Sequence, residues 1–176
     1  MTAKKIQNRD FFTCEAPELA KKLIGKLIFH KVGSKQEKNE FIIRTRITET
    51  EAYLKDDSCL DYNRQKKETC QILIGGHIHL PQKVEGRRRM DIVANIKEIP
   101  ESVLIAKTDG YDGPQKTLWA LDINDHHLDG LDLTNKDSEV WIEDDGTIAE
   151  LKEPTTRTNV HDSRLLCFSA KTFKFI

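Results

Sequence analysis

The sequence predicts an α+β fold in a single domain that spans residues 1–176. Segments with strand character outnumber segments with helix character, and the two kinds do not alternate regularly, which argues against a doubly wound sheet. A length of 176 residues suits one ordinary domain with its own core. Asp-Gly pairs at 109–110, 129–130 and 145–146 indicate turns between the elements.

The first half of the chain has the clearest pattern. Residues Ala16 to Ile24 form a predicted helix, because Pro17 suits the first turn and Gly25 suits the C-terminal stop. Strands are expected over 26–32 and from Phe41 to Tyr53, joined by a polar hairpin turn. We also expect a polar loop over 54–70, extended segments over 75–79, 102–107, 140–142 and 164–168, and a short helix over 113–121.

The sequence contains no segment that indicates export or membrane insertion. Residues Met1 to Asp10 are polar, and the apolar runs are only a few residues long. We therefore expect a cytoplasmic, nucleoid-associated protein with no membrane partner. The cysteines Cys14, Cys59, Cys70 and Cys167 lack a CxxC spacing, which favours thiols over disulfides and leaves a zinc site as the less favoured alternative.

The formal net charge of −1 conceals an uneven distribution. Between Ala120 and Glu153 there are eleven acidic residues and two lysines, a balance of −9, so the rest of the chain carries +8. A positive face can bind a polyanion such as DNA, although an ordinary solvated surface gives the same mixture of charges. The basic residues cluster at Arg64, Lys66 and Lys67 and at Lys83, Arg87, Arg88 and Arg89.

Glu51 is the most unusual residue of the long predicted strand. If side chains alternate strictly, Glu49 and Glu51 share the apolar face that carries Ile47. Because an ionised carboxylate is costly to bury without partners, these acids either lie beyond the sheet edge, pair with a cation or line a pocket. In a pocket, Glu51 could serve as a general base beside a planar substrate stacked on Tyr53. An ordinary strand end with exposed acids gives the same pattern.

Four stretches of the chain resemble a known family. Residues Ile47 to Leu54 read ITETEAYL, which resembles the signature strand of the 3-methyladenine (alkyladenine) DNA glycosylases. Residues 10–26, 113–123 and 130–142 agree with the same family in order and spacing. The Glu-Thr-Glu-Ala-Tyr element is fairly specific in this context, whereas Gly-Pro-x-Lys alone is a weak signal.

The resemblance implies a curved, mainly antiparallel sheet with a few short helices. It implies a monofunctional enzyme of base-excision repair that flips an alkylated purine out of double-stranded DNA and hydrolyses its N-glycosidic bond. By position, Glu51 is the general base that activates the attacking water, and Tyr53 is one wall of the base pocket. The reaction requires neither a metal nor an organic cofactor, and the family expectation is a monomer.

Several positions depart from the family's pattern. The histidine, tyrosine and asparagine of the family's base pocket fall at Tyr62, Pro81 and Asp91. The tyrosine that wedges into DNA falls at Val84, and an arginine that holds the attacking water falls at Ala106. We expect base-binding roles for Tyr53, Tyr62, His79, Pro81 and Asp91, and DNA-binding roles for Val84, Arg87, Arg88, Arg89, Lys107 and Lys116.

Two other interpretations remain open. A catalytically impaired descendant would keep the fold and the basic face, bind duplex DNA with a strong salt dependence and release no base. A metal enzyme would use His77, His79, His126 or His127. A lone His-x-His pair is more often a hydrogen-bonded surface pair than a metal site.

Overall fold

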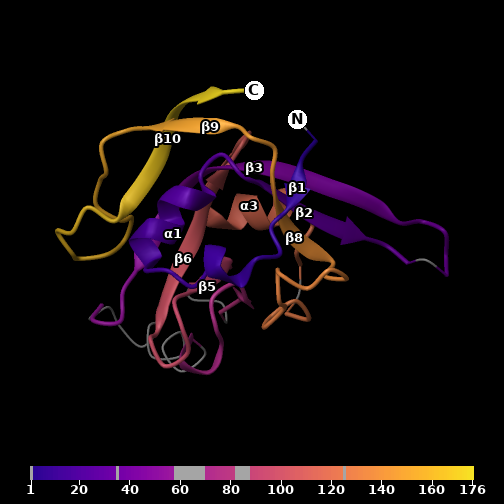
Figure 1. Ribbon diagram of the computed structural model, residues 1–176, viewed down its shortest axis with the longest axis horizontal. Coiled ribbons are helices and arrows are strands. Elements are labelled where there is room, and N and C mark those ends of the chain that lie inside the picture. The colour runs from indigo at the N-terminus through magenta and orange to yellow at the C-terminus, as the bar shows by residue number, and fades with distance from the viewer. Residues whose placement is uncertain (1, 35, 58–69, 82–87, 125) are drawn as a thin grey trace.

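The protein is built on one curled, antiparallel sheet with short helices packed against it (Figure 1). The computed structural model describes residues 2–34, 36–57, 70–81, 88–124 and 126–176. In these residues the strand order is β1-β8-β2-β3-β6-β5-β4, with β10 also paired to β3, β9 paired to β10 and β7 paired to β6. All of these strand pairs are antiparallel. The predicted α+β class with a curved, mainly antiparallel sheet is confirmed.

The helices of the described part are short and the strands range from two residues to thirteen. The helical elements are η1 (Arg9–Phe11), α1 (Ala16–Leu23) and α3 (Pro114–Ala120). The strands are β1 (Lys4–Lys5), β2 (Leu27–Val32), β3 (Phe41–Tyr53), β4 (Ile78–His79), β5 (Asp91–Ala94), β6 (Glu101–Thr108), β7 (Tyr111–Asp112), β8 (Val140–Asp144), β9 (Ile148–Leu151) and β10 (Cys167–Lys174).

Most of the predicted elements are present within a residue or two of the expected bounds. There are two exceptions: the segment expected over 75–79 is a strand only at Ile78–His79, and the last strand, expected over 164–168, runs from Cys167 to Lys174. Arg164 instead binds Asp162 in the preceding loop and Asp56 after β3, and pairing of the last strand with β3 begins at Cys167. The strands β5 and β9 were not predicted, since each is only four residues long and lacks a clear alternation.

The alternation of side chains along the central strand β3 is interrupted once. Its register with β6 shifts between Ile47 and Glu49 and again between Glu49 and Thr50, as it does at a β-bulge. Before the shift, Ile47 is buried in the main core, which includes residues of α1. After the shift, Thr50 points to this same side and is buried against α1. The expectation that Glu51 shares a face with Ile47 is therefore wrong, because one added residue moves every later side chain to the other face.

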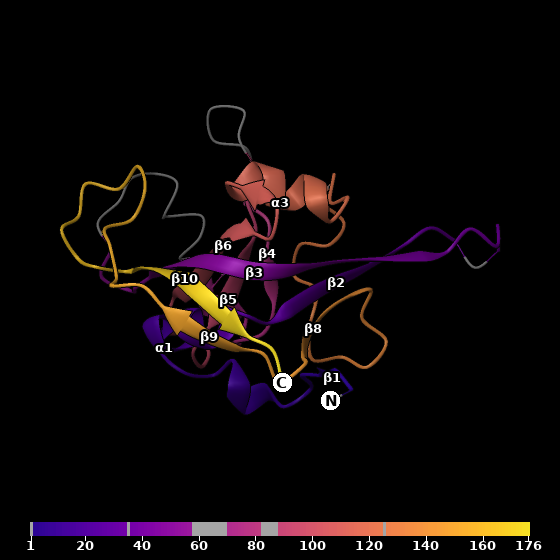
Figure 2. The ribbon, with the colours of Figure 1, turned by 90° about the horizontal axis from the view of Figure 1, so that it is seen from above.

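The main core lies between the sheet and α1 and extends to the residues around α3. Figure 2 shows α1 and α3 on opposite sides of β3. Phe12, Leu19 and Leu23 pack with the sheet residues Ile47 and Ile105 in one buried cluster, and each such side chain contributes about 1.5–3 kcal/mol by leaving water. Within the described residues, no helix has the length and apolar character needed to cross a bilayer.

A hydrogen bond beside the bulge fixes the orientation of the end of β3. Thr50 Oγ1 donates to the carbonyl oxygen of Ala20 at 2.9 Å, one of the last carbonyls of α1, which lack a partner within the helix. We expect Thr50→Val to lower the free energy of unfolding by about 1–3 kcal/mol, because it leaves this buried acceptor unsatisfied. Thr48→Val, at a half-buried site on the same strand, is expected to change it by less than about 0.5 kcal/mol. Urea unfolding measures both, and equal effects would contradict this role for Thr50.

Candidate active site around Glu51

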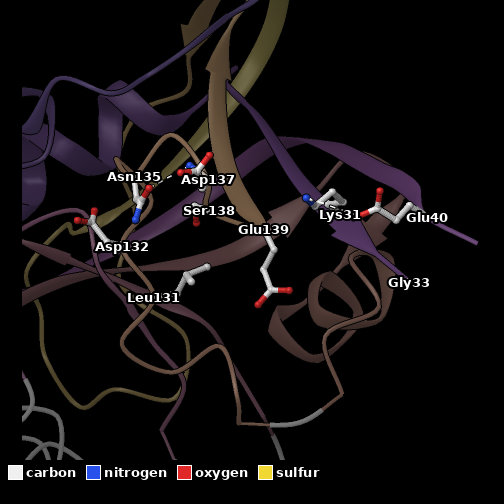
Figure 3. A pocket seen from close by; sticks show the side chains of 9 residues that line it. All are labelled: Lys31, Gly33, Glu40, Leu131, Asp132, Asn135, Asp137, Ser138 and Glu139. Atoms are coloured by element: carbon white, nitrogen blue, oxygen red, sulfur yellow. Dashed lines mark hydrogen bonds and ion pairs between the residues drawn. The ribbon is translucent and has the colours of Figure 1, made fainter. Parts of the chain in front are cut away.

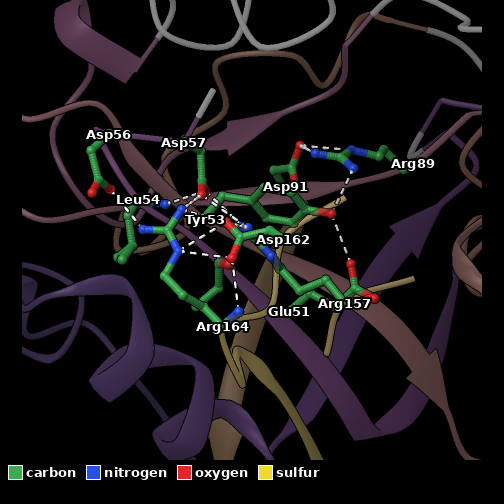
Figure 4. A network of polar contacts seen from close by, with 11 residues as sticks. Glu51, Tyr53, Leu54, Asp56, Asp57, Arg89, Asp91, Arg157, Asp162 and Arg164 are labelled. Carbon is green, nitrogen blue, oxygen red and sulfur yellow. Dashed lines mark hydrogen bonds and ion pairs between the residues drawn. The ribbon is translucent and has the colours of Figure 1, made fainter. Parts of the chain in front are cut away.

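Glu51 lies near the end of β3 with neighbouring strands on both sides. Its cross-strand partners are Leu104 on β6 and Cys167 on β10, and only 2% of the residue is exposed. Its Oε2 accepts a hydrogen bond of 2.8 Å from the Tyr53 hydroxyl (Figure 4). Its Oε1 accepts one of 2.8 Å from the backbone N–H of Thr158. The carboxylate is thus turned inward and held by one donor on each oxygen.

The Tyr53 ring lies beside this carboxylate and beneath cationic groups. The guanidinium carbons of Arg89 and Arg157 lie 4.8 Å and 4.6 Å from the ring centroid, within the range of a cation–π interaction. The residue is 4% exposed. Burial raises the pKa of the Tyr53 hydroxyl; Arg89 opposes this shift and Glu51 adds to it. The hydroxyl therefore keeps its proton near neutral pH and remains a donor to Glu51.

Arg89 links Tyr53 to a second buried carboxylate. Asp91, the first residue of β5, has no exposed surface. Its Oδ2 accepts from Arg89 Nε at 3.2 Å and lies 3.1 Å from Arg89 Nη2. Arg89 Nη1 donates to the Tyr53 hydroxyl oxygen at 3.4 Å. Glu51, Tyr53, Arg89 and Asp91 therefore form one continuous polar chain across the sheet (Figure 4).

The loop that supplies the Thr158 N–H is anchored by a buried arginine. The Arg157 side chain has no exposed surface, and its Nη1 donates to the Ala52 carbonyl oxygen at 3.0 Å. Its two terminal nitrogens bind both oxygens of Asp57, at 2.6 Å and 2.9 Å. Nη2 also donates to Asp162 at 2.9 Å. This bidentate geometry fixes the loop backbone one residue before Thr158.

A second, partly exposed arginine binds acidic residues of the same network. Arg164 donates to Asp56 at 2.9 Å, to Asp162 at 2.6 Å and to Asp57. The hydrogen bond from Arg164 is the main cause that lowers the pKa of Asp162 to about 2. The carboxylates of this network therefore pair with two guanidinium groups.

The remaining predicted base-binding residues lie on the neighbouring strands or just after them. His79 on β4 is the cross-strand partner of Asp91 and is almost fully buried. Its Nδ1 lies 3.3 Å from Asp129. Burial opposes ionisation of Asp129, but the hydrogen bonds from His79 and from the Leu80 N–H keep the pKa of Asp129 below its ordinary value. Pro81 is buried and lines a small hollow together with Arg88, Arg89 and His126.

The predicted DNA-binding residues are only partly gathered at this site. The Lys107 amino group lies 3.1 Å from both Glu49 and Asp112, and Lys116 is exposed on α3. Ala106 packs with Tyr53, on the face of Glu51. Predictions were also made for Tyr62, Val84 and Arg87, which lie outside the described residues.

A second hollow lies in a different part of the protein. It has a volume of about 460 Å³ and an acidic lining from the start of the β2–β3 hairpin and from 131–139 (Figure 3). Three of its four acidic residues, Asp132, Asp137 and Glu139, belong to the negative segment of the sequence, and the fourth is Glu40. This hollow therefore does not suit a nucleic acid.

The histidines proposed as metal ligands have separate partners. His77 Nδ1 lies 2.7 Å from the Ile74 carbonyl oxygen and 3.5 Å from Arg9, whereas His79 contacts Asp129. Among the residues that the structure describes, no three His, Cys, Asp or Glu side chains are grouped in a way that could hold a metal ion.

The residues that hold Glu51 from outside β3 were not found from the sequence. Arg157 and Thr158 lie more than a hundred residues from the β3 residues that they contact, Ala52 and Glu51, in a segment with no helical or strand periodicity. A pair of arginines among aspartates over 157–164 is the only sequence signal, and such charges are usual in solvated loops.

Comparison with known proteins identifies the family of this chain. The model of the methylpurine-DNA glycosylase family matches residues 10–109, which include Glu51, Tyr53, Arg89 and Asp91. The chain belongs to the methylpurine-DNA glycosylase family. The loop with Arg157 and Thr158 lies beyond the matched residues.

Individual relatives agree with this assignment. The chain is 33% identical over 102 residues to a Clostridium novyi (strain NT) protein named "Putative 3-methyladenine DNA glycosylase", a match that covers 56% of this chain and 47% of that protein. Proteins of the same name from Clostridioides difficile (strain 630) and Borreliella afzelii (strain PKo) are 34% and 32% identical over 55% and 56% of this chain, and over 47% and 52% of their own length. The chain thus spans about half the length of the curated relatives it matches.

The network around Arg157 predicts a large difference between two adjacent aspartates. Asp57→Asn removes a buried charge from two arginines and is expected to lower the free energy of unfolding by about 3 kcal/mol. Asp56→Asn, at a side chain that is 68% exposed, is expected to lower the free energy of unfolding far less, because solvent screens an exposed ion pair. Urea unfolding of the two variants tests this difference, and similar losses would show that the buried network does not stabilise the fold.

Proposed function

We propose that this protein hydrolyses the N-glycosidic bond of alkylated purines in double-stranded DNA, with Glu51 as the general base. Family membership supports the reaction class. The observation that carries the assignment to Glu51 is its inward-turned carboxylate, which accepts one hydrogen bond on each oxygen. A partly desolvated, oriented carboxylate of this kind is suited to general-base catalysis.

The proposed reaction begins when the damaged nucleotide is flipped out of the duplex, because the bond to be cut is not accessible inside the stack. Each carboxylate oxygen has two lone pairs, so Glu51 can still accept a hydrogen bond from a water. As the bond between the sugar C1′ and the purine nitrogen breaks, its electrons leave with the base. The water oxygen bonds to C1′, and Glu51 accepts the proton that the water loses.

Tyr53 and Thr158 orient the base catalyst in this scheme. The Tyr53 hydroxyl and the Thr158 N–H restrict the rotation of the carboxylate, which keeps its remaining lone pairs in a fixed direction. An alkylated purine carries a positive charge and leaves readily, so the protein needs to supply little acid catalysis. The proposal requires no metal and no organic cofactor.

Duplex DNA is the proposed partner, with the protein acting as a monomer. Arg88, Lys107 and Lys116 are proposed to contact phosphates, because cationic side chains supply most of the sequence-independent affinity for DNA. Val84 and Arg87 remain proposed as wedge and phosphate contact. The expected salt dependence of binding follows from the release of counterions.

A non-catalytic DNA-binding protein is the second candidate function. It is favoured by Ala106, which contacts Tyr53 on the face of Glu51 and has no group that could hold a water. It is also favoured by the two guanidinium groups that lie over Tyr53. This protein would bind lesion-containing duplexes and release no base.

Base release from duplexes with 3-methyladenine, 7-methylguanine, ethenoadenine or hypoxanthine distinguishes the two candidates. We expect the wild-type protein to release at least one of these bases and Glu51→Gln to slow release by about 10²–10⁴-fold, the usual contribution of a general base. Glu150→Gln, an exposed change on β9, should release the base at the wild-type rate. Binding without release would favour the second candidate, and unchanged release by Glu51→Gln would remove Glu51 from the mechanism.

A further inference from the structure

The loop between β9 and β10 covers the face of β3 that carries Glu51. It projects past the end of β3 (Figure 2). The Thr158 N–H of this loop donates to the Glu51 carboxylate, and the Val160 side chain packs against a small apolar cluster on the same face. The residues of this cluster are Tyr53, Leu104 and Ala106. The outer side of the loop is exposed at Asn159, His161 and Ser163. The loop therefore lies between Glu51 and solvent.

Glu51 has less access to solvent than the proposed reaction requires. Only 2% of Glu51 and 4% of Tyr53 are exposed. A general base has to come within hydrogen-bond reach of the attacking water, and the sugar of the flipped nucleotide has to lie next to that water. A nucleotide cannot reach a carboxylate that is covered in this way, so part of the cover has to move.

The loop is the backbone segment of this cover that can move at the lowest cost. The strands on either side of Glu51, β6 and β10, are both paired with β3. Residues 156–166 belong to no strand, and side chains hold them to the sheet. A segment of this kind opens at a lower free energy than a strand inside a sheet. Opening of the loop leaves β3, β6 and β10 paired.

One carboxylate closes the loop. Asp162 Oδ2 accepts from Arg157 Nη2 at 2.9 Å and from Arg164 Nη2 at 2.6 Å. Arg157 is itself fixed, because its side chain has no exposed surface and binds both oxygens of Asp57. Release of Asp162 from Arg157 therefore frees residues 158–163 while Arg157 stays in place.

The backbone at Asn159 directs the apolar contact of the loop. Its φ of 58° lies in the left-handed region, which asparagine adopts more readily than most residues. The chain turns at this residue, and the next side chain, Val160, lies against the apolar cluster. Val160 thus contributes the apolar part of the contact that keeps the loop closed.

We propose that residues 158–163 form a lid over Glu51 that is closed in the DNA-free protein and has to open to admit the flipped nucleotide. The proposal rests on the proposed function, because it concerns access of the substrate to Glu51. The open lid is a minor state of the free protein. When the lid closes again over the nucleotide, the Thr158 N–H returns to Glu51 and orients it for the reaction.

Thiol labelling measures opening of the lid without reference to activity. The thiol introduced by Ala106→Cys lies in the cluster that Val160 covers, and its reaction with iodoacetamide is followed by mass spectrometry. We expect it to react far more slowly than the thiol introduced by Glu150→Cys, at an exposed site on β9. Adding Asp162→Asn should accelerate the reaction about tenfold, because the lid loses a charge-assisted hydrogen bond.

Two further variants control this measurement. Val160→Ala should also accelerate the labelling, by about fivefold or more, because two fewer carbon atoms leave water when the lid closes. Asp137→Asn removes a charge at an exposed site away from the lid and should leave the rate unchanged. Labelling of the Ala106→Cys thiol at the rate of an exposed thiol, or no acceleration by Asp162→Asn, would overturn the proposal.

A reversible lock tests whether base release requires the lid to open. The variant Ala106→Cys/Val160→Cys places one thiol on the lid and one beneath it, and mass spectrometry confirms the disulfide after oxidation. We expect the oxidised form to release 7-methylguanine from a duplex about 100-fold more slowly than the reduced form, because the competent state is removed. Dithiothreitol should restore release. In the control Glu150→Cys/Thr172→Cys, a cross-strand pair of β9 and β10, oxidation should change nothing.

The lock also separates the lid from the glycosylase activity. Equal release by the oxidised and reduced lid variants would support the activity and contradict the lid. A lack of release by every form, together with the expected labelling rates and with lesion binding that is lost on oxidation, would support the lid and contradict the activity. The binding probe is a duplex with one 2′-fluoro-7-methylguanine nucleotide, in which the fluorine blocks release.

Discussion

A carboxylate that is buried within a sheet requires donors, and this requirement determines the architecture around Glu51. The bulge in β3 turns Thr50 toward α1 and Glu51 toward the other face of the strand. On the other face, the Tyr53 hydroxyl comes from the same strand and the Thr158 N–H from a loop far away in the sequence. The site therefore depends on holding that loop in place.

The ion network of Arg157 is the physical means by which the loop is held. A bidentate guanidinium–carboxylate contact restricts both distance and orientation, and Arg157 binds Asp57 in this way while it also contacts the Ala52 carbonyl between Glu51 and Tyr53. Arg157 therefore positions Ala52 through a hydrogen bond, and it positions Thr158 because Thr158 is the next residue in the chain. Arg89 and Asp91 extend the charged region to β5, and the Asp91 and Glu51 carboxylates each accept a hydrogen bond from a side chain.

Local patterns in the sequence were sufficient to predict much of the fold, including the bounds of β3 from Phe41 to Tyr53. They also identified Glu51 and Tyr53 as neighbours on one face, since residues two apart in a strand share a face. They failed at the bulge, because a register shift between Ile47 and Thr50 depends on the strands that pair with β3. Arg157 and Thr158 were missed for a similar reason: their partners are distant in sequence and no spacing rule connects them.

The most direct test of this account is amide hydrogen exchange at Thr158, measured by NMR on the full chain. If the Glu51 carboxylate holds the loop, the Thr158 N–H is expected to exchange slowly in the wild-type protein, and Glu51→Ala should accelerate it by about tenfold or more, the loss of about 1.4 kcal/mol of protection. Exchange at the rate of an open loop in the wild-type protein, or no acceleration in the variant, would contradict the proposal that this contact orients Glu51.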